Sequence, residues 1–366
     1  MKSSILFILH LPPPVHGAST MGKYIQESQT INEEFNCTFI NLATAESMVD
    51  IGKFKFNKII VFIKLLIKIY KTVNQVKPQL VYITPNAKGA PFYKDFIVVQ
   101  FLKMIKCNII AHYHNKGVKE KENNILDNFL YKSFFKNIHV ILLSEILYRD
   151  ISKYVKKKNV HICPNGIPNT AGREHNKDNN IHQLLYLSNL QKEKGIIDVL
   201  DACKILKDKG YTFECNIIGG ETIEINRETL NEEINNRNLN DRVYYLGKKY
   251  DKEKNFHYNK TDIFLFPTYY HNECFPVVLL EAMQHGCVCI STNEGGILDI
   301  IDNHINGFIV EKKRPSMLAE KIEILFNDKN LMSEMSNASV EKYNQNFTLD
   351  KFEKNILTIL KKLTNP

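Results

Sequence analysis

The stretch TDIFLFPTYYHNECFPVVLLEAMQHG, residues 261–286, decides the fold of this chain. It contains a short, mostly apolar run, residues 262–267, then a polar loop, and then a second apolar segment that starts near Pro276. Such a run is typical of a strand buried on both faces of a parallel sheet, and proline favours the first turn of a helix. The stretch therefore predicts a strand followed by a helix, as in a βαβ unit.

Short apolar runs alternate with longer amphipathic stretches along the whole chain, which predicts parallel sheets crossed by helices. In the first half we expect strands at residues 5–11, 37–42, 80–84, 107–113, 138–143 and 160–163. In the second half we expect them at residues 183–188, 212–218, 242–246, 262–267, 287–292 and 307–310. The fold class is therefore α/β, with two doubly wound, Rossmann-like domains facing each other across a cleft and ligands at the carboxyl ends of the strands.

A length of 366 residues also favours two domains. Between the two halves lies a polar segment with Gly, Pro and Asn, which predicts a linker. We expect an N-terminal domain over residues 1–166, the linker over residues 167–182 and a C-terminal domain over residues 183–347. The remaining segment, residues 348–366, has the pattern of an amphipathic helix.

Basic residues are concentrated in the first half of the chain. Residues 1–165 carry 23 Lys or Arg against 11 Asp or Glu, a net charge of +12, whereas residues 166–366 carry 25 against 29, a net charge of −4. A basic half indicates an anionic partner, either nucleic acid or lipid headgroups. No nucleic-acid motif is present, so we expect no nucleic-acid partner.

The segment Lys53–Lys71 predicts a basic amphipathic helix, with Lys64, Lys68 and Lys71 spaced along one face. One interpretation is a packed helix with a solvated lysine edge. The other is a helix on anionic lipid, where each basic residue contributes about 1 kcal/mol. The charge of the first half favours the membrane. No apolar run of 18 residues occurs, so we expect no membrane span.

Eight cysteines occur without a C-x-x-C pair and lie mostly inside apolar runs. This pattern argues against a disulfide framework and a structural zinc site and favours a reducing, cytoplasmic compartment. His112 and His114 point to one side of a strand end, but no further ligands follow at zinc spacing. Residues 17–24, GASTMGKY, fit G-x-x-x-x-G-K but end in Tyr, and no G-x-G-x-x-G occurs, so neither an ATPase or GTPase nor a nicotinamide enzyme is favoured.

Two glutamates flank the predicted start of the helix after residue 267. Glu273 lies in the loop before it and Glu281 lies within it. The free N–H groups of a helix start favour a phosphate, and ionised carboxylates accept hydrogen bonds from sugar hydroxyls. The alternative is a surface glutamate beside a glutamate that faces a lysine. The surrounding pattern favours a site for a phosphate and a polyol.

Residues 273–281 resemble the E-x7-E motif of the retaining glycosyltransferases of family four, which have the GT-B fold. Further segments resemble that family in the same order along the chain. They are PNGI at 164–167, LYLSNLQKEKG at 185–195, IIGG at 217–220, VYYLG at 243–247 and EGG at 294–296. Their shared order is more specific than any single match.

The resemblance implies a role for each matching residue. Lys194 contacts the donor diphosphate, Glu281 holds the nucleotide ribose, and Glu273 holds the hydroxyls of the transferred sugar. Gly219 lies at a strand end that encloses the base, and His114 matches an active-site histidine that contacts the sugar. The further donor-binding residues that it implies are Gly17 and Ser19 in the turn after the first strand, and the backbone N–H groups of Phe275, Val277 and Val278.

One position departs from the family pattern. Where the family has arginine beside the lysine on the diphosphate, this chain has Asn189, which cannot form the bidentate contact of a guanidinium. Either Lys192 or another cation replaces the arginine, or the donor is held more weakly. The chain also has no D-x-D motif, so we expect no metal: Lys194 and helix N–H groups neutralise the diphosphate instead.

The resemblance implies a retaining, metal-independent glycosyltransferase that uses a nucleoside diphosphate sugar, in the first place a UDP-sugar, and no other cofactor. The first domain binds a glycan or polyprenyl-linked acceptor, and the final helix returns to it. We expect a cytoplasmic enzyme, peripheral on the inner leaflet of the plasma membrane, in capsule, O-antigen or exopolysaccharide assembly. The alternatives are a nucleotide-sugar 2-epimerase of the same fold and a catalytically degenerate, sugar-binding protein.

Overall fold

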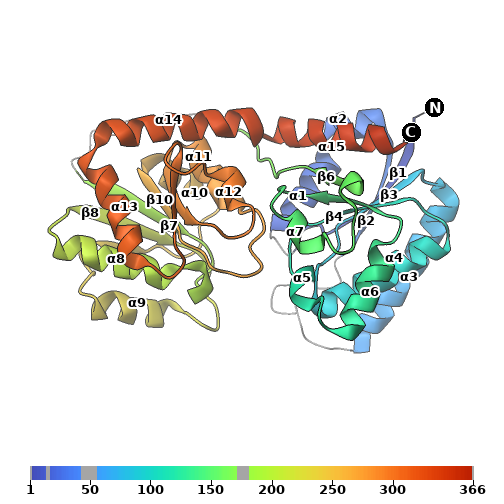
Figure 1. Cartoon of the computed structure of the whole chain (residues 1–366), viewed down its shortest axis with the longest axis horizontal. Helices are drawn as coiled ribbons and strands as arrows, with labels where there is room; N and C mark the ends of the chain where they lie inside the picture. The colour runs from blue at the N-terminus through green and yellow to red at the C-terminus, as the bar shows by residue number, and fades with distance from the viewer. Residues whose placement is uncertain (1, 14–16, 43–55, 171–180, 365–366) are drawn as a thin grey trace. The chain divides into compact units, whose positions relative to one another are not determined.

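The computed structural model describes residues 2–13, 17–42, 56–170 and 181–364. The chain divides into two compact units (Figure 1). The first contains Met1–Asn165 together with Leu349–Pro366, and the second contains Gly166–Thr348. Among the described residues, no helix is long and apolar enough to span a membrane.

The first unit is built on a parallel, six-stranded sheet with the order β2-β1-β3-β4-β5-β6. Its strands are β1 (Ser4–Leu9), β2 (Asn36–Asn41), β3 (Leu80–Ile83), β4 (Ile109–His112), β5 (His139–Leu142) and β6 (Val160–Ile162). Each strand lies inside or within one residue of an apolar run that the sequence marks. Side chains of the central strands are buried on both faces, which explains why these runs are continuous rather than alternating.

Helices cover both faces of this sheet (Figure 1). One face carries α3 (Phe56–Val76), α4 (Gly89–Met104) and α6 (Ile125–Phe135), and the other carries α1 (Gly17–Glu27), α2 (Gln29–Glu34) and α15 (Leu349–Thr364). The short elements of this unit are α5 (Val118–Lys121), α7 (Tyr148–Ile151) and η2 (Lys157–Asn159). Right-handed crossovers require this arrangement, because connections running in opposite directions along the sheet cover opposite faces.

The final helix, α15, packs on the first unit. Its apolar stripe includes the buried Phe352 and Ile356. The ammonium group of Lys361 lies 3.0 Å from a carboxylate oxygen of Glu34, and Phe352 places its carbonyl oxygen 3.9 Å from the sulfur of Cys163. The first unit is therefore assembled from two separate parts of the chain.

The second unit contains another parallel, six-stranded sheet, with the order β12-β11-β10-β7-β8-β9. Its strands are β7 (His182–Leu187), β8 (Phe213–Ile218), β9 (Val243–Tyr245), β10 (Ile263–Phe266), β11 (Val288–Thr292) and β12 (Gly307–Val310). Its helices are η3 (Lys192–Lys194), α8 (Ile196–Asp208), α9 (Arg227–Asn236), α10 (Asp251–Lys260), α11 (Val277–Gln284), α12 (Ile297–Ile300), α13 (Pro315–Asn327) and α14 (Lys329–Asn346). The α/β fold class is confirmed in both units.

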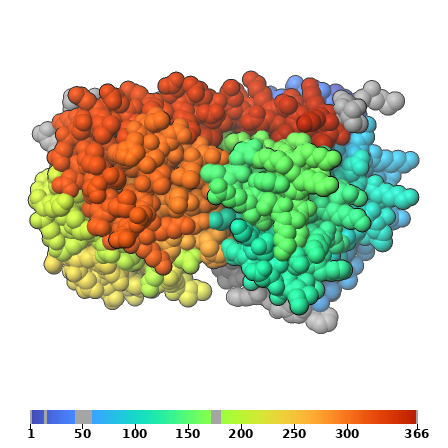
Figure 2. All heavy atoms as spheres, viewed as in Figure 1, coloured from blue at the N-terminus to red at the C-terminus, as the bar shows by residue number. Residues whose placement is uncertain are grey.

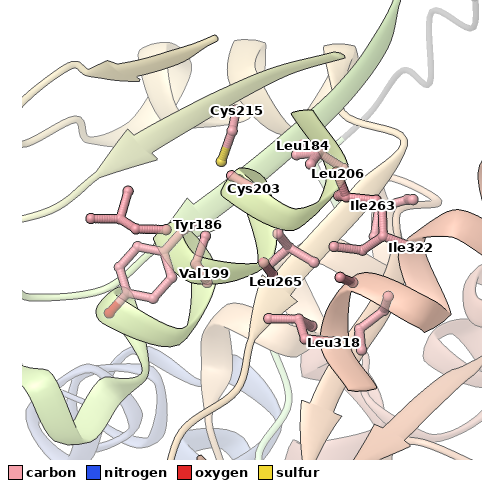
Figure 3. Packing of buried hydrophobic residues seen from close by; sticks show 14 of the residues in the cluster. Leu184, Tyr186, Val199, Cys203, Leu206, Cys215, Ile263, Leu265, Leu318 and Ile322 are labelled. Carbon is pink, nitrogen blue, oxygen red and sulfur yellow. The ribbon is translucent and has the colours of Figure 1, made fainter. Parts of the chain in front are cut away.

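The core of the second unit lies between its sheet and the helices α8 and α13 (Figure 3). Leu184 and Leu265 from the sheet face Val199 of α8 and Leu318 of α13. All four side chains are fully buried or nearly so. This packing fixes the sheet, and therefore the carboxyl ends of the strands from which the loops of the candidate site start.

Two expectations differ from the structure in detail, and some residues of the expected linker and of the predicted basic helix lie outside the described residues. Ile167, at the start of the expected linker, is already part of the second unit, because it pairs with Thr348 and accepts a hydrogen bond from the hydroxyl of Tyr343 at 3.1 Å. Residues 171–180 of that linker and residues 53–55 of the predicted basic helix lie outside the described residues. Gly17 and Ser19 lie in the first turn of α1 and not in a loop, so GASTMGKY forms no phosphate loop.

Candidate functional site

Lys194 ends the short helix η3, which follows the carboxyl end of β7. Its Nζ atom lies 2.6 Å from Oε2 of Glu273, and 15% and 10% of the two side chains are exposed. The same Nζ atom lies 4.4 Å from the centre of the Tyr270 ring, a distance that stabilises a cation over an aromatic face. The structure therefore brings two of the predicted site residues into direct contact.

The loop that carries Glu273 connects β10 to α11, and it packs against a glycine turn at residues 294–296. Gly295 has a φ of +56°, and a Cβ atom there would lie 2.4 Å from the carbonyl oxygen of Glu273. The next N–H, of Gly296, donates to the carbonyl of Cys274 at 2.7 Å. Because no larger residue fits at position 295, the turn at 294–296 fixes how closely the backbone of Glu273 approaches it.

Helix α11 begins directly after Pro276, as the sequence predicts. Phe275 is buried before the helix, and Val277 and Val278 form its first turn, where backbone N–H groups have no partner within the helix. This places the N–H groups of Val277 and Val278 four and five residues after Glu273, since Pro276 has no N–H.

Glu281 lies in the second turn of α11 and is held by two groups from α10. The Nζ atom of Lys254 lies 2.6 Å from Oε1, and the hydroxyl of Tyr258 donates to Oε2 at 3.1 Å. Burial, and then the neighbouring carboxylate, raises the pKa of Tyr258 well above its ordinary value, so this phenol remains a donor. The carboxylate of Glu281 thus has a fixed orientation.

Gly219 follows β8 at a place where three chain segments meet. A Cβ atom on it would lie 1.7 Å from the carbonyl oxygen of Ser188, so only glycine fits. Its N–H donates to the carbonyl of Gly247, and its own carbonyl accepts from the hydroxyl of Tyr245, both at 3.0 Å. The guanidinium of Arg227 lies 4.6 Å above the Tyr245 ring.

Asn189 has a lysine beside it. A Cβ atom built on Gly220 would lie 3.0 Å from Oδ1 of Asn189 and 3.4 Å from Nζ of Lys248. Both side chains therefore reach the same space over Gly220. Lys248 comes from the loop after β9, whereas Asn189 comes from the loop after β7. No spacing rule along the sequence links the two positions, which is why Lys248 is not among the predicted residues.

The remaining predicted residues, His114, Gly17 and Ser19, lie in the first unit. The rings of His114 and His112 are 4.2 Å apart between centroids; His112 is the last residue of β4, and His114 follows the strand. Burial, and then the neighbouring His114, lowers the pKa of His112 well below its ordinary range, and its Nδ1 atom contacts the hydroxyl of Tyr82. His112 is therefore a neutral, hydrogen-bonded core residue.

Sequence reasoning missed the groups that orient the predicted residues. Lys254, Tyr258 and Tyr270 contact the predicted glutamates or lysine, but each lies on another element and outside any motif. Lys312 likewise contacts Glu294 at 2.5 Å beside the glycine turn. In the part of the chain that the structure describes, no group of three or more His, Cys, Asp or Glu side chains could hold a metal ion.

The segment that carries Lys194, Glu273 and Glu281 is similar to a known protein family. Residues 169–342 match the family described as glycosyl transferases group 1. These residues, just under half of the chain, are similar to that family. They include Lys194, Gly219, Glu273 and Glu281, together with every other predicted site residue of the second unit.

Individual glycosyltransferases are similar to this chain over different lengths. The capsular polysaccharide biosynthesis glycosyltransferase CapM of Staphylococcus aureus is 28% identical over 286 residues, which cover 74% of this chain and 73% of CapM. The amylovoran biosynthesis glycosyltransferase AmsK of Erwinia amylovora is 32% identical over 146 residues, which cover 38% of this chain and only 35% of AmsK.

Among solved structures, Anabaena HepE in complex with UDP superposes with a TM-score of 0.77 at 15% sequence identity, covering 98% of this chain and all of HepE. Another HepE structure contains UDP-glucose. At this identity the likeness shows the fold alone. The two units of this chain therefore have the GT-B arrangement of elements that the resemblance implies.

Proposed function

We propose that the protein is a retaining glycosyltransferase that moves a sugar from a nucleoside diphosphate sugar to a hydroxyl of a glycan or polyprenyl-linked acceptor. The contact of Lys194 with Glu273, beside the start of α11, carries this proposal. It places a cation, helix N–H groups and a carboxylate within the segment that is similar to the group 1 family. These are the groups that a diphosphate and a sugar together require.

In the proposed reaction the acceptor oxygen bonds to the anomeric carbon on the face from which the diphosphate leaves. The bond from that carbon to the phosphate oxygen breaks, and the acceptor proton passes to the departing phosphate oxygen. Lys194 and the N–H groups of Phe275, Val277 and Val278 stabilise the charge that grows on the leaving group. Metal independence is part of this proposal, because a lysine and a helix start take the role of the cation.

The ion pair between Lys194 and Glu273 predicts an order in which the two parts of the donor are bound. A diphosphate carries more charge than one carboxylate, so we expect it to draw the ammonium group away from Glu273. The released carboxylate then accepts hydrogen bonds from the hydroxyls of the transferred sugar. Glu281, already oriented by Lys254 and Tyr258, holds the ribose. The roles of His114, Gly17, Ser19 and Gly219 remain predictions from the family resemblance.

We also propose that Lys248 replaces the arginine that the family has at position 189. Its ammonium group reaches the space beside Asn189, from a different loop. A lysine provides the charge of an arginine but not its bidentate geometry. The donor diphosphate therefore keeps two cations, Lys194 and Lys248, without an arginine.

For the biological setting we propose capsule, O-antigen or exopolysaccharide assembly at the cytoplasmic leaflet of a membrane, with a UDP-sugar as donor. The names of CapM and AmsK support the pathway, and the UDP and UDP-glucose in the HepE structures support the donor class.

The decisive test is thermal stabilisation by UDP, GDP, ADP, CDP and dTDP without added metal. A ligand at about 100 times its Kd stabilises the folded state by about 2.7 kcal/mol, which is a clear shift in Tm. We expect one diphosphate to raise Tm, and Lys194→Ala and Glu281→Ala to abolish the shift. No shift with any of the five would overturn the donor site. Conversion of the nucleotide sugar without an acceptor would identify an epimerase instead.

A further inference from the structure

Among the described residues of the first unit, the large apolar side chains that are strongly exposed lie on one layer of helices. The structure describes twelve large, strongly exposed apolar side chains in this unit, and all of them lie on α3, α4 or α6. The most exposed are Ile125, Met104 and Phe129, at 89%, 70% and 67%. Scattered exposed apolar residues are normal in proteins, but their confinement to three adjacent helices is not.

The three helices lie side by side, so these side chains share one surface. The Tyr70 ring of α3 contacts the Phe101 ring of α4, with 6.3 Å between centroids. The hydroxyl of Tyr93 on α4 donates to the carboxylate of Asp127 on α6 at 2.8 Å. Figure 1 shows α3, α4 and α6 next to one another, and Figure 2 shows atoms of this layer at the molecular surface in blue to green. We call it the three-helix surface.

Helix α3 has two apolar stripes rather than one. Leu65 and Ile69 are buried against the sheet side, at 8% and 0% exposure. Ile63 and Ile67 lie on the opposite side, at 50% and 49% exposure. A helix that only covers a sheet needs a single stripe, so the core does not explain the second.

The charges on the three-helix surface all have one sign. The three helices contain only two acidic residues, Asp95 and Asp127, and both are buried. Lys64, Lys68 and Lys71 are exposed in a row beside the outer stripe of α3. The surface therefore combines exposed apolar groups with lysines and offers no exposed carboxylate from these helices.

We propose that the three-helix surface docks on an anionic lipid membrane. The isoleucine, tyrosine and phenylalanine side chains enter the boundary between headgroups and acyl chains, and the lysines contact the lipid phosphates. A second copy of the chain is a poorer occupant, because a symmetric dimer would bring the lysine rows of both copies into one interface. This inference rests on the membrane location proposed above and adds the surface that would dock there. The residues that carry it do not belong to the donor site.

Vesicle sedimentation tests the charge contribution. The probe is the full chain with vesicles of phosphatidylcholine and phosphatidylglycerol in a three-to-one ratio. We expect binding that weakens with added salt. The variant Lys64→Gln/Lys68→Gln/Lys71→Gln should bind about 100-fold more weakly, at about fivefold for each lysine. The matched control, Lys252→Gln/Lys260→Gln/Lys329→Gln in the second unit, should bind like the wild type. Equal binding by both triple variants would overturn the proposal.

A second pair of variants tests the apolar contribution. Ile63→Ser/Ile67→Ser should lose vesicle binding, whereas Ile223→Ser/Ile305→Ser, which changes exposed residues of the second unit, should retain it. Circular dichroism and the Tm shift with nucleotide check that each variant is folded, and they report on the donor site separately. No binding by the wild type would overturn the proposal. A wild-type dimer in sedimentation velocity that Ile63→Ser/Ile67→Ser abolishes would assign the surface to a second copy and overturn it too.

Discussion

The ammonium group of Lys194 and the carboxylate of Glu273 lie 2.6 Å apart, although 79 positions separate the two residues in the chain. Two loops meet here: one follows β7, and the other follows β10, its neighbour in the sheet. Because both side chains are mostly buried, each is the main compensation for the charge of the other. The pair is therefore both a stabilising contact and the proposed switch between empty and donor-bound states.

Removal of the pair should reveal its coupling energy. Lys194→Met leaves a buried carboxylate without its cation and should lower the free energy of unfolding by about 1–3 kcal/mol. The double variant Lys194→Met/Glu273→Gln should recover part of this loss. Urea unfolding of the wild type, both single variants and the double variant measures the coupling. Strict additivity of the two single changes would show that the pair contributes nothing.

Orientation of Glu281 by α10 can be tested without changing Glu281 itself. Tyr258→Phe and Lys254→Met each remove one contact to the carboxylate. Loss of one charge-assisted hydrogen bond corresponds to about a tenfold weaker nucleotide affinity. Isothermal titration with the nucleoside diphosphate measures the change, and Lys260→Met on the same helix is the control. Unchanged affinity in both variants would argue that Glu281 does not contact the nucleotide.

If Lys248 takes the role of the family arginine at position 189, an arginine placed at that position should compensate for the loss of Lys248. Lys248→Ala should weaken diphosphate binding about tenfold, as expected for one charged contact. Adding Asn189→Arg to that variant should restore the affinity, because the guanidinium occupies the same space from the other loop. Titration with UDP and with uridine separates the effect on phosphate from the effect on the base. A failure of Asn189→Arg to restore binding would leave Lys248 without this role.

Acid sensitivity of the first unit should depend on His161. Its Nε2 atom lies 3.3 Å from Nδ1 of His139 on the neighbouring strand. Burial, and then the neighbouring His139, lowers the pKa of His161 from 6.5 to about 4. The unfolded chain therefore takes up this proton first, and stability is lost as the pH falls from 6.5 to about 4.

The variant His161→Gln should lose less stability across that window than the wild type. Thermal unfolding at a series of pH values between 7 and 4.5 measures the difference. Parallel profiles for the two proteins would locate the acid sensitivity elsewhere.

The twelve strands that the structure describes could all be predicted from the sequence, and the central ones most directly, because parallel strands buried on both faces are continuous apolar runs. The order along the chain of the segments that resemble the family indicated Lys194, Glu273 and Glu281. The residues that orient them, such as Lys254, could not be predicted, because contacts between elements depend on how the loops run. The basic helix at α3 was predicted in part, but the exposed residues of α4 and α6 were not. Periodicity shows an apolar face without showing whether a sheet covers it.

The two-part origin of the first unit has a consequence for how the protein is made. Its sheet precedes the second unit in the chain, but α15, whose Phe352 and Ile356 complete the packing, follows that unit. The second unit is inserted between these parts and is contiguous, so it can close as soon as Thr348 has emerged. During synthesis the apolar surface that α15 covers therefore stays exposed until the second unit has emerged. The second unit can complete its folding before the first unit does.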